Sequence, residues 1–229
     1  MPLAPSSLPK TSPAPGQPAA GLLGACALAC RRGRRLLFKG LDLQMRPGSI
    51  TWLRGRNGSG KTSLLRILAG LSAPAEGEVT WQGAALGASA MAAHRGTLYI
   101  GHANALKDDL TLTEAVAFLA RLQALDDAPR RARAALDRLG LGSRRDAMVR
   151  TLSQGQRRRG ALARLALDDA PRAWVLDEPF DALDNDSVTL LSGLIEEHAA
   201  RGGAVLLTSH QAVDLAGAVE FDLEPFRPA

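Results

Sequence analysis

One stretch of eight residues has the composition and spacing of a phosphate-binding loop. Residues 55–62 read Gly-Arg-Asn-Gly-Ser-Gly-Lys-Thr, which fits the pattern G-x-x-x-x-G-K-[ST] at every position. Glycines let backbone N–H groups turn inward as an anion-binding nest, and Lys61 adds a positive charge near the β- and γ-phosphates. Thr62 offers a hydroxyl to Mg²⁺. The candidate nucleotide contacts are Gly55, Arg56, Asn57, Gly58, Ser59, Gly60, Lys61, Thr62 and Ser63.

A phosphate-binding loop (P-loop) requires a strand before it and a helix after it. Residues 49–54 have the β-branched and aromatic composition of a buried strand. Residues 64–70 have helical spacing and end on Gly70, where a helix would stop. A glycine-rich turn without a ligand is the alternative for the motif alone, and these flanks argue against it. The sequence therefore predicts that the chain binds a nucleoside triphosphate.

A second candidate site is an apolar run, residues 174–178, that ends in two carboxylates. In a parallel α/β sheet the carboxyl ends of strands line the ligand crevice, so Asp177 is expected beside the P-loop, where it can hold Mg²⁺. Glu178 is placed to polarise an attacking water. Acidic pairs after strands often only cap the next helix, but Pro179 follows and a P-loop precedes. This pair is predicted to be catalytic.

Residues 152–156, Leu-Ser-Gln-Gly-Gln, precede three arginines and a helical run. Ser153 is expected to be the N-cap of this helix, and Gly155 lets backbone N–H groups approach an anion. The stretch is thus a candidate second phosphate-binding site, with Ser153, Gly155 and Gln156 as its contacts. Taken alone it would be an ordinary capped basic helix.

Length and composition favour one α/β domain. The chain has 229 residues with 46% hydrophobic residues, and its mean hydropathy of -0.04 argues against a membrane-spanning protein. Its +5 charge is concentrated in the first 66 residues, around the P-loop, and no aromatic-rich basic module accompanies it, so we expect no nucleic-acid partner. Cys26 and Cys30 are too few for a disulfide framework or a zinc site, which favours a reduced cytoplasmic protein.

The chain is expected to divide into a disordered Pro/Ala-rich extension, residues 1–20, and one domain, residues 21–229. Residues 11–30 are uncharged, but prolines interrupt the run and arginines follow it, an order that disfavours a secretory signal. A helical subdomain is expected at about 103–165, because the apolar spacing there becomes helical. Further strands are predicted at 22–30, 36–45, 76–83, 97–100, 173–177 and 204–208, and a helix at 184–200.

The ordered set of motifs resembles that of an ABC transporter ATPase over about residues 22–223. The set comprises the P-loop, Leu-Ser-Gln-Gly-Gln (152–156), Asp177-Glu178, Asp-Ala-Leu-Asp (181–184) and Thr-Ser-His (208–210). The resemblance implies a RecA-like α/β core with an antiparallel β subdomain and a helical insert, and ATP with Mg²⁺ as cofactors. It also implies that two copies pair head to tail, so that Ser153 and Gly155 of one copy close on the γ-phosphate held by the other. Glu178 would be the catalytic base and His210 a γ-phosphate contact.

Finer features resemble one branch of that family, the ATP-binding subunits of cytochrome c biogenesis haem exporters. Tyr-Ile-Gly-His (99–102) stands where most ABC ATPases have a glutamine, which makes His102 a further nucleotide-site candidate; Trp-Gln-Gly (81–83) and the compact single cassette also match. The resemblance implies ATP hydrolysis coupled to haem export for c-type cytochrome maturation. It implies integral-membrane permease partners that contact the helical insert near His102, and a peripheral location on the cytoplasmic face of the bacterial inner membrane. No CxxCH motif or other haem site is evident in the sequence.

Two positions depart from the family pattern. Arg32 stands near the position where an aromatic residue usually stacks on adenine, and its guanidinium could stack instead. Gln154 replaces a small residue that the family usually has in Leu-Ser-Gln-Gly-Gln (152–156), its signature motif. Two alternatives stay open at this point: the ATPase subunit of another ABC importer or exporter, and a non-transport ABC ATP-binding module. Intact Glu178 and His210 favour a hydrolysing protein.

Overall fold

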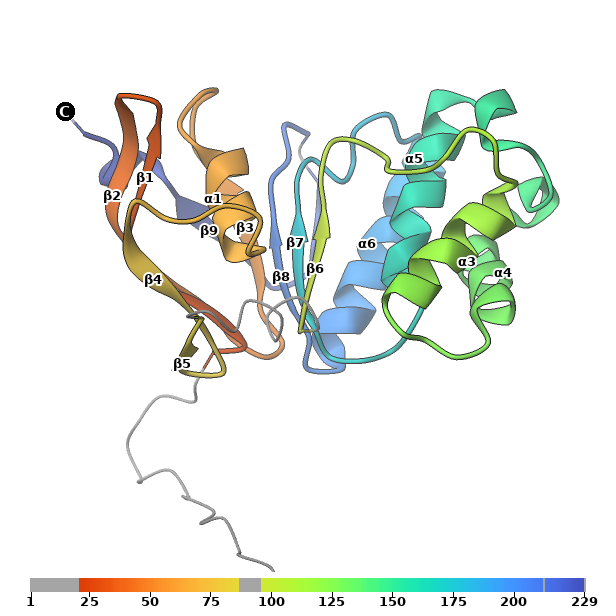
Figure 1. Cartoon of the computed structure of the whole chain (residues 1–229), viewed down its shortest axis with the longest axis horizontal. Coiled ribbons are helices and arrows are strands. Elements are labelled where there is room, and N and C mark those ends of the chain that lie inside the picture. The colour runs from red at the N-terminus through yellow and green to blue at the C-terminus, as the bar shows by residue number, and fades with distance from the viewer. Residues whose placement is uncertain (1–20, 87–95, 212, 229) are drawn as a thin grey trace, which may run out of the picture.

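The computed structural model describes residues 21–86, 96–211 and 213–228, which form two β-sheets and five α-helices together with short 3-10 turns (Figure 1). The predicted N-terminal extension, residues 1–20, lies outside the described residues. The strands are β1 (Leu23–Arg32), β2 (Arg35–Met45), β3 (Ile50–Arg54), β4 (Glu76–Trp81), β5 (Ala84–Ala85), β6 (Thr97–Ile100), β7 (Ala173–Leu176), β8 (Ala204–Leu207) and β9 (Ala218–Asp222). The helices are α1 (Lys61–Leu68), α3 (Leu112–Leu122), α4 (Ala128–Arg138), α5 (Gln154–Leu162) and α6 (Asn185–Ala200), with 3-10 turns η1 (Gly142–Arg144), η2 (Val149–Thr151), η3 (Ala163–Ala166) and η4 (Glu224–Phe226).

The central sheet has five parallel strands in the order β6-β7-β8-β3-β9. Strands β7 and β8 are short apolar runs that are buried along their whole length, as expected for parallel strands covered on both faces. Along β7, Trp174 and Leu176 enter the core shared with α3–α6, and Ala173 and Val175 enter the core shared with α1 and the second sheet. The alternation of side chains along each strand therefore divides the interior into two cores.

Helices and the second sheet cover opposite faces of the central sheet. Helix α6 and the helices α3, α4 and α5 lie on one side, and α1 with strands β1, β2 and β4 lies on the other (Figure 1). Helix α3 begins with a capping box in which Thr111 and Glu114 bond each other's backbone N–H groups. Its buried face, which includes Leu112 and Val116, packs in the same core as Leu136 of α4. Helices α3, α4 and α5 all lie within the range 103–165; the exact limits of a subdomain there stay a prediction.

The second sheet is antiparallel, with the order β2-β1-β4-β5. Strand β1 is bulged at Ala27, whose φ is +48° and whose N–H donates to Asp42 Oδ1 at 2.8 Å. Gly77 of β4 passes close to this bulge, since a Cβ on Gly77 would lie 2.4 Å from the carbonyl oxygens of Cys26 and Ala27. The two sheets and the intervening helices confirm the predicted fold class.

Sequence patterns did not predict two strands. Strand β9 pairs in parallel with β3 at the edge of the central sheet, but it is short, carries Glu220 and Asp222, and is partly exposed, with Val219 68% exposed. An edge strand with acidic residues gives neither a continuous apolar run nor a clean alternation. Strand β5 has only two residues. Both are defined by hydrogen bonds to their neighbours rather than by composition.

Buried His198 is the basis of a prediction about stability. Its ring stacks on Trp174, with centroids 3.6 Å apart, and its Nε2 lies 2.9 Å from the carbonyl oxygen of Arg172. Burial lowers the pKa of His198, which the hydrogen bond to Arg172 offsets only in part. As pH falls below about 6.5, the unfolded chain therefore binds a proton that the native protein resists, and the free energy of unfolding falls.

We expect His198→Gln, which keeps a donor for Arg172, to lose less stability than the wild type between pH 8 and pH 5.5. Urea unfolding at the two pH values, with His210→Gln as the exposed-histidine control, measures the difference. Equal losses in the wild type and the His198→Gln variant would show that His198 does not contribute to the pH dependence.

Candidate nucleotide-binding site

The order of the parallel strands brings the predicted site residues to one edge of the central sheet. In spatial order the strand ends carry His102 after β6, Asp177 and Glu178 after β7, Thr208 and His210 after β8, and residues 55–62 after β3. These strands are adjacent and parallel, so their carboxyl ends lie side by side. Residues separated by more than 150 positions in the chain therefore share one crevice.

The P-loop has the backbone of an anion-binding turn. Gly55, Gly58 and Gly60 all have positive φ, at 146°, 77° and 109°. Gly60 is the N-cap of α1, and a Cβ there would also lie 3.1–3.3 Å from Phe38 and Leu37, so both conformation and packing require glycine. Helix α1 begins at Lys61 and directs the positive end of its dipole at the loop.

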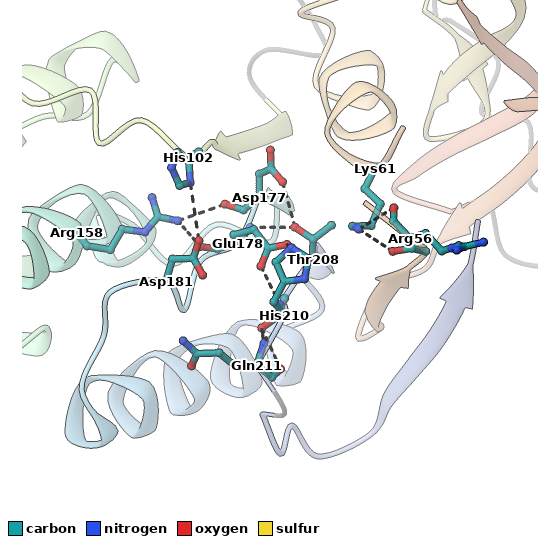
Figure 2. Close-up of polar contacts among 12 residues, drawn as sticks. Arg56, Lys61, His102, Arg158, Asp177, Glu178, Asp181, Thr208, His210 and Gln211 are labelled. Atoms are coloured by element: carbon teal, nitrogen blue, oxygen red, sulfur yellow. Dashed lines mark hydrogen bonds and ion pairs between the residues drawn. The ribbon is translucent and has the colours of Figure 1, made fainter. Parts of the chain in front are cut away.

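Lys61 folds back across the loop that precedes it. Its Nζ donates to the carbonyl oxygen of Gly55 at 2.7 Å and lies 3.4 Å from that of Arg56 (Figure 2). These contacts hold the ammonium group over the turn of the loop. A phosphate held by the loop's N–H groups would therefore meet this positive charge.

A cavity of about 410 Å³ opens over the loop. It is lined by Arg32, Arg35, Leu37, Arg56, Asn57, Gly58, Gly60, Lys61, Thr62, Ser63, Asp177, Glu178 and His210. Of the predicted contacts, Gly55 and Ser59 belong to the loop but do not line this cavity, and Ser59 is buried beneath it. Four cationic side chains beside two carboxylates suit a polyanion that is bound together with a divalent cation.

A hydrogen-bonded chain fixes the two carboxylates. Thr208 Oγ1 accepts from the N–H of Glu178 at 2.9 Å and donates to Asp177 Oδ1 at 3.1 Å (Figure 2). Glu178 Oε2 accepts from the N–H of His210 at 3.0 Å, and Glu178 Oε1 lies 3.4 Å from His210 Nε2. The Glu178 side chain is only 13% exposed, so its carboxylate is held in a defined position at the edge of the cavity. Such an arrangement can orient and polarise a water molecule.

The residues present fit a magnesium ion that is coordinated partly by the protein and partly by the bound nucleotide and water. Asp177 is 5% exposed, and it and Thr62 line the same cavity. Over the described ranges, no group of three or more His, Cys, Asp or Glu side chains is arranged to hold a metal. Mg²⁺ commonly takes one or two protein ligands and completes its octahedron with phosphate oxygens and water. Thr62 and Asp177 can supply such a pair.

His102 lies beside the cavity rather than in it. Its side chain is 81% exposed, and its Nδ1 is 3.8 Å from Asp181 Oδ2. His102 lines a neighbouring hollow that also includes Thr62 and Asp177, the two candidate metal ligands. Thr62 and Asp177 line both the hollow and the cavity over the P-loop, so His102 is a neighbour of the site. His102 itself does not line the cavity.

The predicted second phosphate site lies apart from the cavity. Ser153 caps α5 as expected: its Oγ accepts from the N–H of Gln156, and Gln156 Oε1 accepts from the N–H of Ser153. Gly155 packs against the 181–184 segment, since a Cβ there would lie 2.9 Å from the carbonyl oxygen of Ala182. None of these three predicted contacts lines the cavity over the P-loop, and α5 and α1 lie on opposite sides of the central sheet (Figure 1).

Sequence analysis did not single out Arg158, which the structure buries behind the cavity against the backbone of Asp177 and Glu178. Arg158 is 3% exposed and donates to the carbonyl oxygens of Gly101, directly before His102, and of Glu178. Figure 2 shows the contact with Glu178. Arg158 had appeared as one of three consecutive arginines before a helical run. A signal was present, because Arg158 precedes the buried Ala161 and Leu162 by three and four residues and so shares their helical face.

This combination of fold and site defines a P-loop nucleotide-binding cassette of the ABC type. The family model described as "ABC transporter" matches residues 38–181, and the chain belongs to that family. Solved structures agree. The "Structure of ATP binding subunit of ABC transporter" has a TM-score of 0.75 and 26% identity, covering 82% of this chain and 79% of that one. A structure described as a dimeric bacterial ABC transporter cassette has a TM-score of 0.75 at 21% identity, with 88% and 94% of the two chains covered.

More similar relatives come from one branch of the family. The cytochrome c biogenesis ATP-binding export protein CcmA of Aromatoleum aromaticum is 49% identical over 83% of this chain and 89% of its own length. The protein of the same name from Nitrosospira multiformis is 44% identical over 83% and 92%. That from Methylococcus capsulatus is 47% identical over 85% and 94%. These findings confirm the resemblance that the sequence motifs indicated.

Loss of the Lys61 ammonium is expected to weaken nucleotide binding. We expect Lys61→Ala to raise the Kd for MgATP by about tenfold or more, equivalent to about 1.4 kcal/mol, because the phosphates would lose the ammonium group that lies over the turn of the loop. Equilibrium binding of a fluorescent ATP analogue measures the change. Lys39→Ala is the control, since Lys39 pairs with Glu76 on the second sheet outside the cavity. Unchanged affinity in Lys61→Ala would refute the P-loop assignment.

Proposed function

We propose that this chain is the ATP-hydrolysing subunit of an ABC transporter complex that serves cytochrome c biogenesis by exporting or delivering haem. The proposal rests on one observation above all: the P-loop, the Asp177-Glu178 pair and His210 line a single cavity. The proteins that share 44–49% identity with this chain are named as cytochrome c biogenesis ATP-binding export proteins. Haem as the cargo is the reading that the sequence resemblance implies.

Hydrolysis would use the groups already arranged in the cavity. Lys61 and the loop N–H groups would hold the phosphates, while Thr62 and Asp177 would hold Mg²⁺, which lowers the charge on the transferred phosphoryl group when bound. Glu178, fixed by the N–H of His210, would polarise the attacking water. The imidazole of His210 is close enough to Glu178 to orient it, and it lines the cavity in which it would contact the γ-phosphate.

A second copy of the chain would complete the site. Ser153, Gly155 and Gln156 do not line the cavity over their own P-loop, so their N-terminal helix end is available to another subunit. Two copies arranged head to tail would place this helix end against the γ-phosphate of the partner, where the helix dipole favours an anion. Gln154 is exposed and would lie on the same contact surface.

Membrane partners would bind at the helical insert. None of the described helices is both long enough and apolar enough to cross a bilayer. Leu71 and Leu122, 46% and 69% exposed, line a hollow between the core and α3, and Phe118 of α3 is 43% exposed. Leu71 also lines the hollow that contains His102. These surfaces support docking of integral-membrane permease subunits, with the chain held peripherally on the cytoplasmic face of the bacterial inner membrane.

The base of the nucleotide would meet arginine. Arg32 and Arg35 line the end of the cavity formed by β1 and β2, and no aromatic side chain is among the described residues that line it. A guanidinium group can stack on a purine as well as pair with phosphate. Triphosphate contacts would then determine affinity more than the identity of the base does.

The water-polarising role of Glu178 leads to a direct prediction. Glu178→Gln should retain MgATP binding but lower turnover by about 100-fold or more, because the amide cannot accept a proton while the phosphate contacts remain. The variant should also accumulate as an MgATP-bound dimer. Steady-state phosphate release and size-exclusion chromatography measure both effects, with Glu197→Gln on the surface of α6 as the control. Wild-type turnover in Glu178→Gln would exclude Glu178 as the base.

The cellular role can be tested in the native host. We expect deletion of the gene to remove covalently bound c-type haem selectively, and complementation by the wild type, but not by Glu178→Gln, to restore it. Haem staining of denatured membrane proteins measures c-type cytochromes, and b-type cytochrome spectra serve as the control. Normal c-type cytochromes in the deletion strain would refute the proposed cargo while leaving the ATPase assignment intact.

A further inference from the structure

One buried arginine links three segments that carry the proposed site. Arg158 lies on α5 one turn after Ser153 and is 3% exposed. Its Nη1 donates to the carbonyl oxygen of Gly101 at 2.9 Å, directly before His102, and lies 3.5 Å from Asn104 Oδ1. Its Nη2 donates to the carbonyl oxygens of Glu178 at 2.6 Å and Asp177 at 3.2 Å. The guanidinium group therefore bonds the loop after β6 and the end of β7 at once, and Figure 2 shows its contacts with Asp177 and Glu178.

The backbone that Arg158 holds is in an unusual conformation. Glu178 has a φ of +49°, and Ala182, in the segment that follows, has a φ of +61°. Residues other than glycine occupy this left-handed region at a cost, and they persist there when surrounding contacts fix them. The N–H of Glu178 is held by Thr208 on one side, and its carbonyl oxygen is held by Arg158 on the other. These two hydrogen bonds define the direction in which the Glu178 carboxylate leaves the backbone.

Nearby carboxylates offset part of the cost of burying the guanidinium. Burial lowers the pKa of Arg158, while the nearby carboxylates of Asp181, Asp177 and Glu178 raise it. An arginine remains charged in such a setting, and a charged donor to a carbonyl forms a stronger hydrogen bond than a neutral one. Its Nε has no hydrogen-bond partner among the described residues, so its hydrogen bonding rests on the two terminal nitrogens.

We propose that Arg158 is a positioning residue for ATP hydrolysis: its guanidinium holds the backbone of Glu178 so that the carboxylate points at the attacking water, and it ties this conformation to the His102 loop and to the signature helix α5. The proposal rests on the proposed function, in which Glu178 is the base. Arg158 does not line the nucleotide cavity, so it would act on turnover rather than on nucleotide affinity.

The test is Arg158→Gln in the full chain, compared with the wild type and with Glu178→Gln. We expect the turnover number to fall by about tenfold or more while the Kd for MgATP changes by less than about threefold. We also expect an MgATP-bound dimer to accumulate, as in Glu178→Gln, because both variants would bind nucleotide without activating water. A residue that only stabilised the fold would not produce this trapped dimer.

Two further variants sharpen the result. Arg159→Gln is the matched control: Arg159 is the next residue on α5, but its guanidinium lies 3.5 Å from the carbonyl oxygen of Leu139 at the end of α4, and we expect wild-type turnover. Arg158→Lys keeps the charge but replaces the two-pronged guanidinium with a single ammonium group, and we expect partial turnover. If Arg158→Gln is not folded by circular dichroism, Arg158→Lys is tested by the same three measurements.

Each outcome decides the proposal. Reduced turnover with retained affinity and a trapped dimer supports it. Wild-type turnover, a large loss of MgATP affinity, or low turnover without a dimer in a folded Arg158 variant would overturn it. The double variant Arg158→Gln/Glu178→Gln adds a second criterion, since a residue acting through Glu178 should cause no further loss there. Wild-type turnover in the Glu178→Gln variant would instead contradict the proposed function, in which Glu178 is the base.

Discussion

The parallel order of strands β6, β7, β8 and β3 is the constraint on which the rest of the structure depends. Only adjacent parallel strands end side by side at one edge, and here each end carries a different chemical group. Strand β8 lies between β3 and β7, so Thr208 can bridge to Asp177 and Glu178 on one side while the P-loop lies on the other. The buried apolar strands thus have a double role: they form the core and they fix the spacing of the crevice.

Charge balance follows from this arrangement. Lys61, Arg56, Arg32 and Arg35 face a cavity that also contains Asp177 and Glu178. A triphosphate with Mg²⁺ would match both sets, because the cations would meet phosphate oxygens while the carboxylate of Asp177 would meet the metal. The net positive charge is concentrated in the first 66 residues, a pattern that on its own could indicate a nucleic-acid partner. This cavity and its surroundings explain part of that charge.

The sequence predicted those parts of the structure that local patterns determine. The P-loop flanks, the buried runs of β7 and β8 and the N-cap of α5 each depend on a few neighbouring residues, and the structure contains all of them. The place of Asp177 at the carboxyl end of a predicted parallel strand also indicated that it would share a crevice with the P-loop. Strand β9 was not predicted because its place is set by pairing with β3, between residues 168 positions apart, and not by its own composition. Arg158 was not predicted for a related reason. The sequence does not distinguish three consecutive arginines, and only the packing of α5 shows that the middle one is buried.

Helix α5, which begins at the signature motif (residues 152–156), forms its proposed phosphate-binding end without a partner. Its capping box satisfies Ser153 and Gln156 within the chain, so the helix end does not need a partner in order to form. Gly155 packs against the carbonyl oxygen of Ala182, and Arg158, one turn further along α5, donates to the carbonyl oxygen of Glu178.

Both contacts are made to the short segment 178–182, which includes two residues in the left-handed region. A displacement of α5 on docking with a second copy would therefore act directly on the backbone of Glu178. In this geometry the helix end that would contact a partner's nucleotide packs against the same backbone segment that carries its own chain's Glu178 carboxylate.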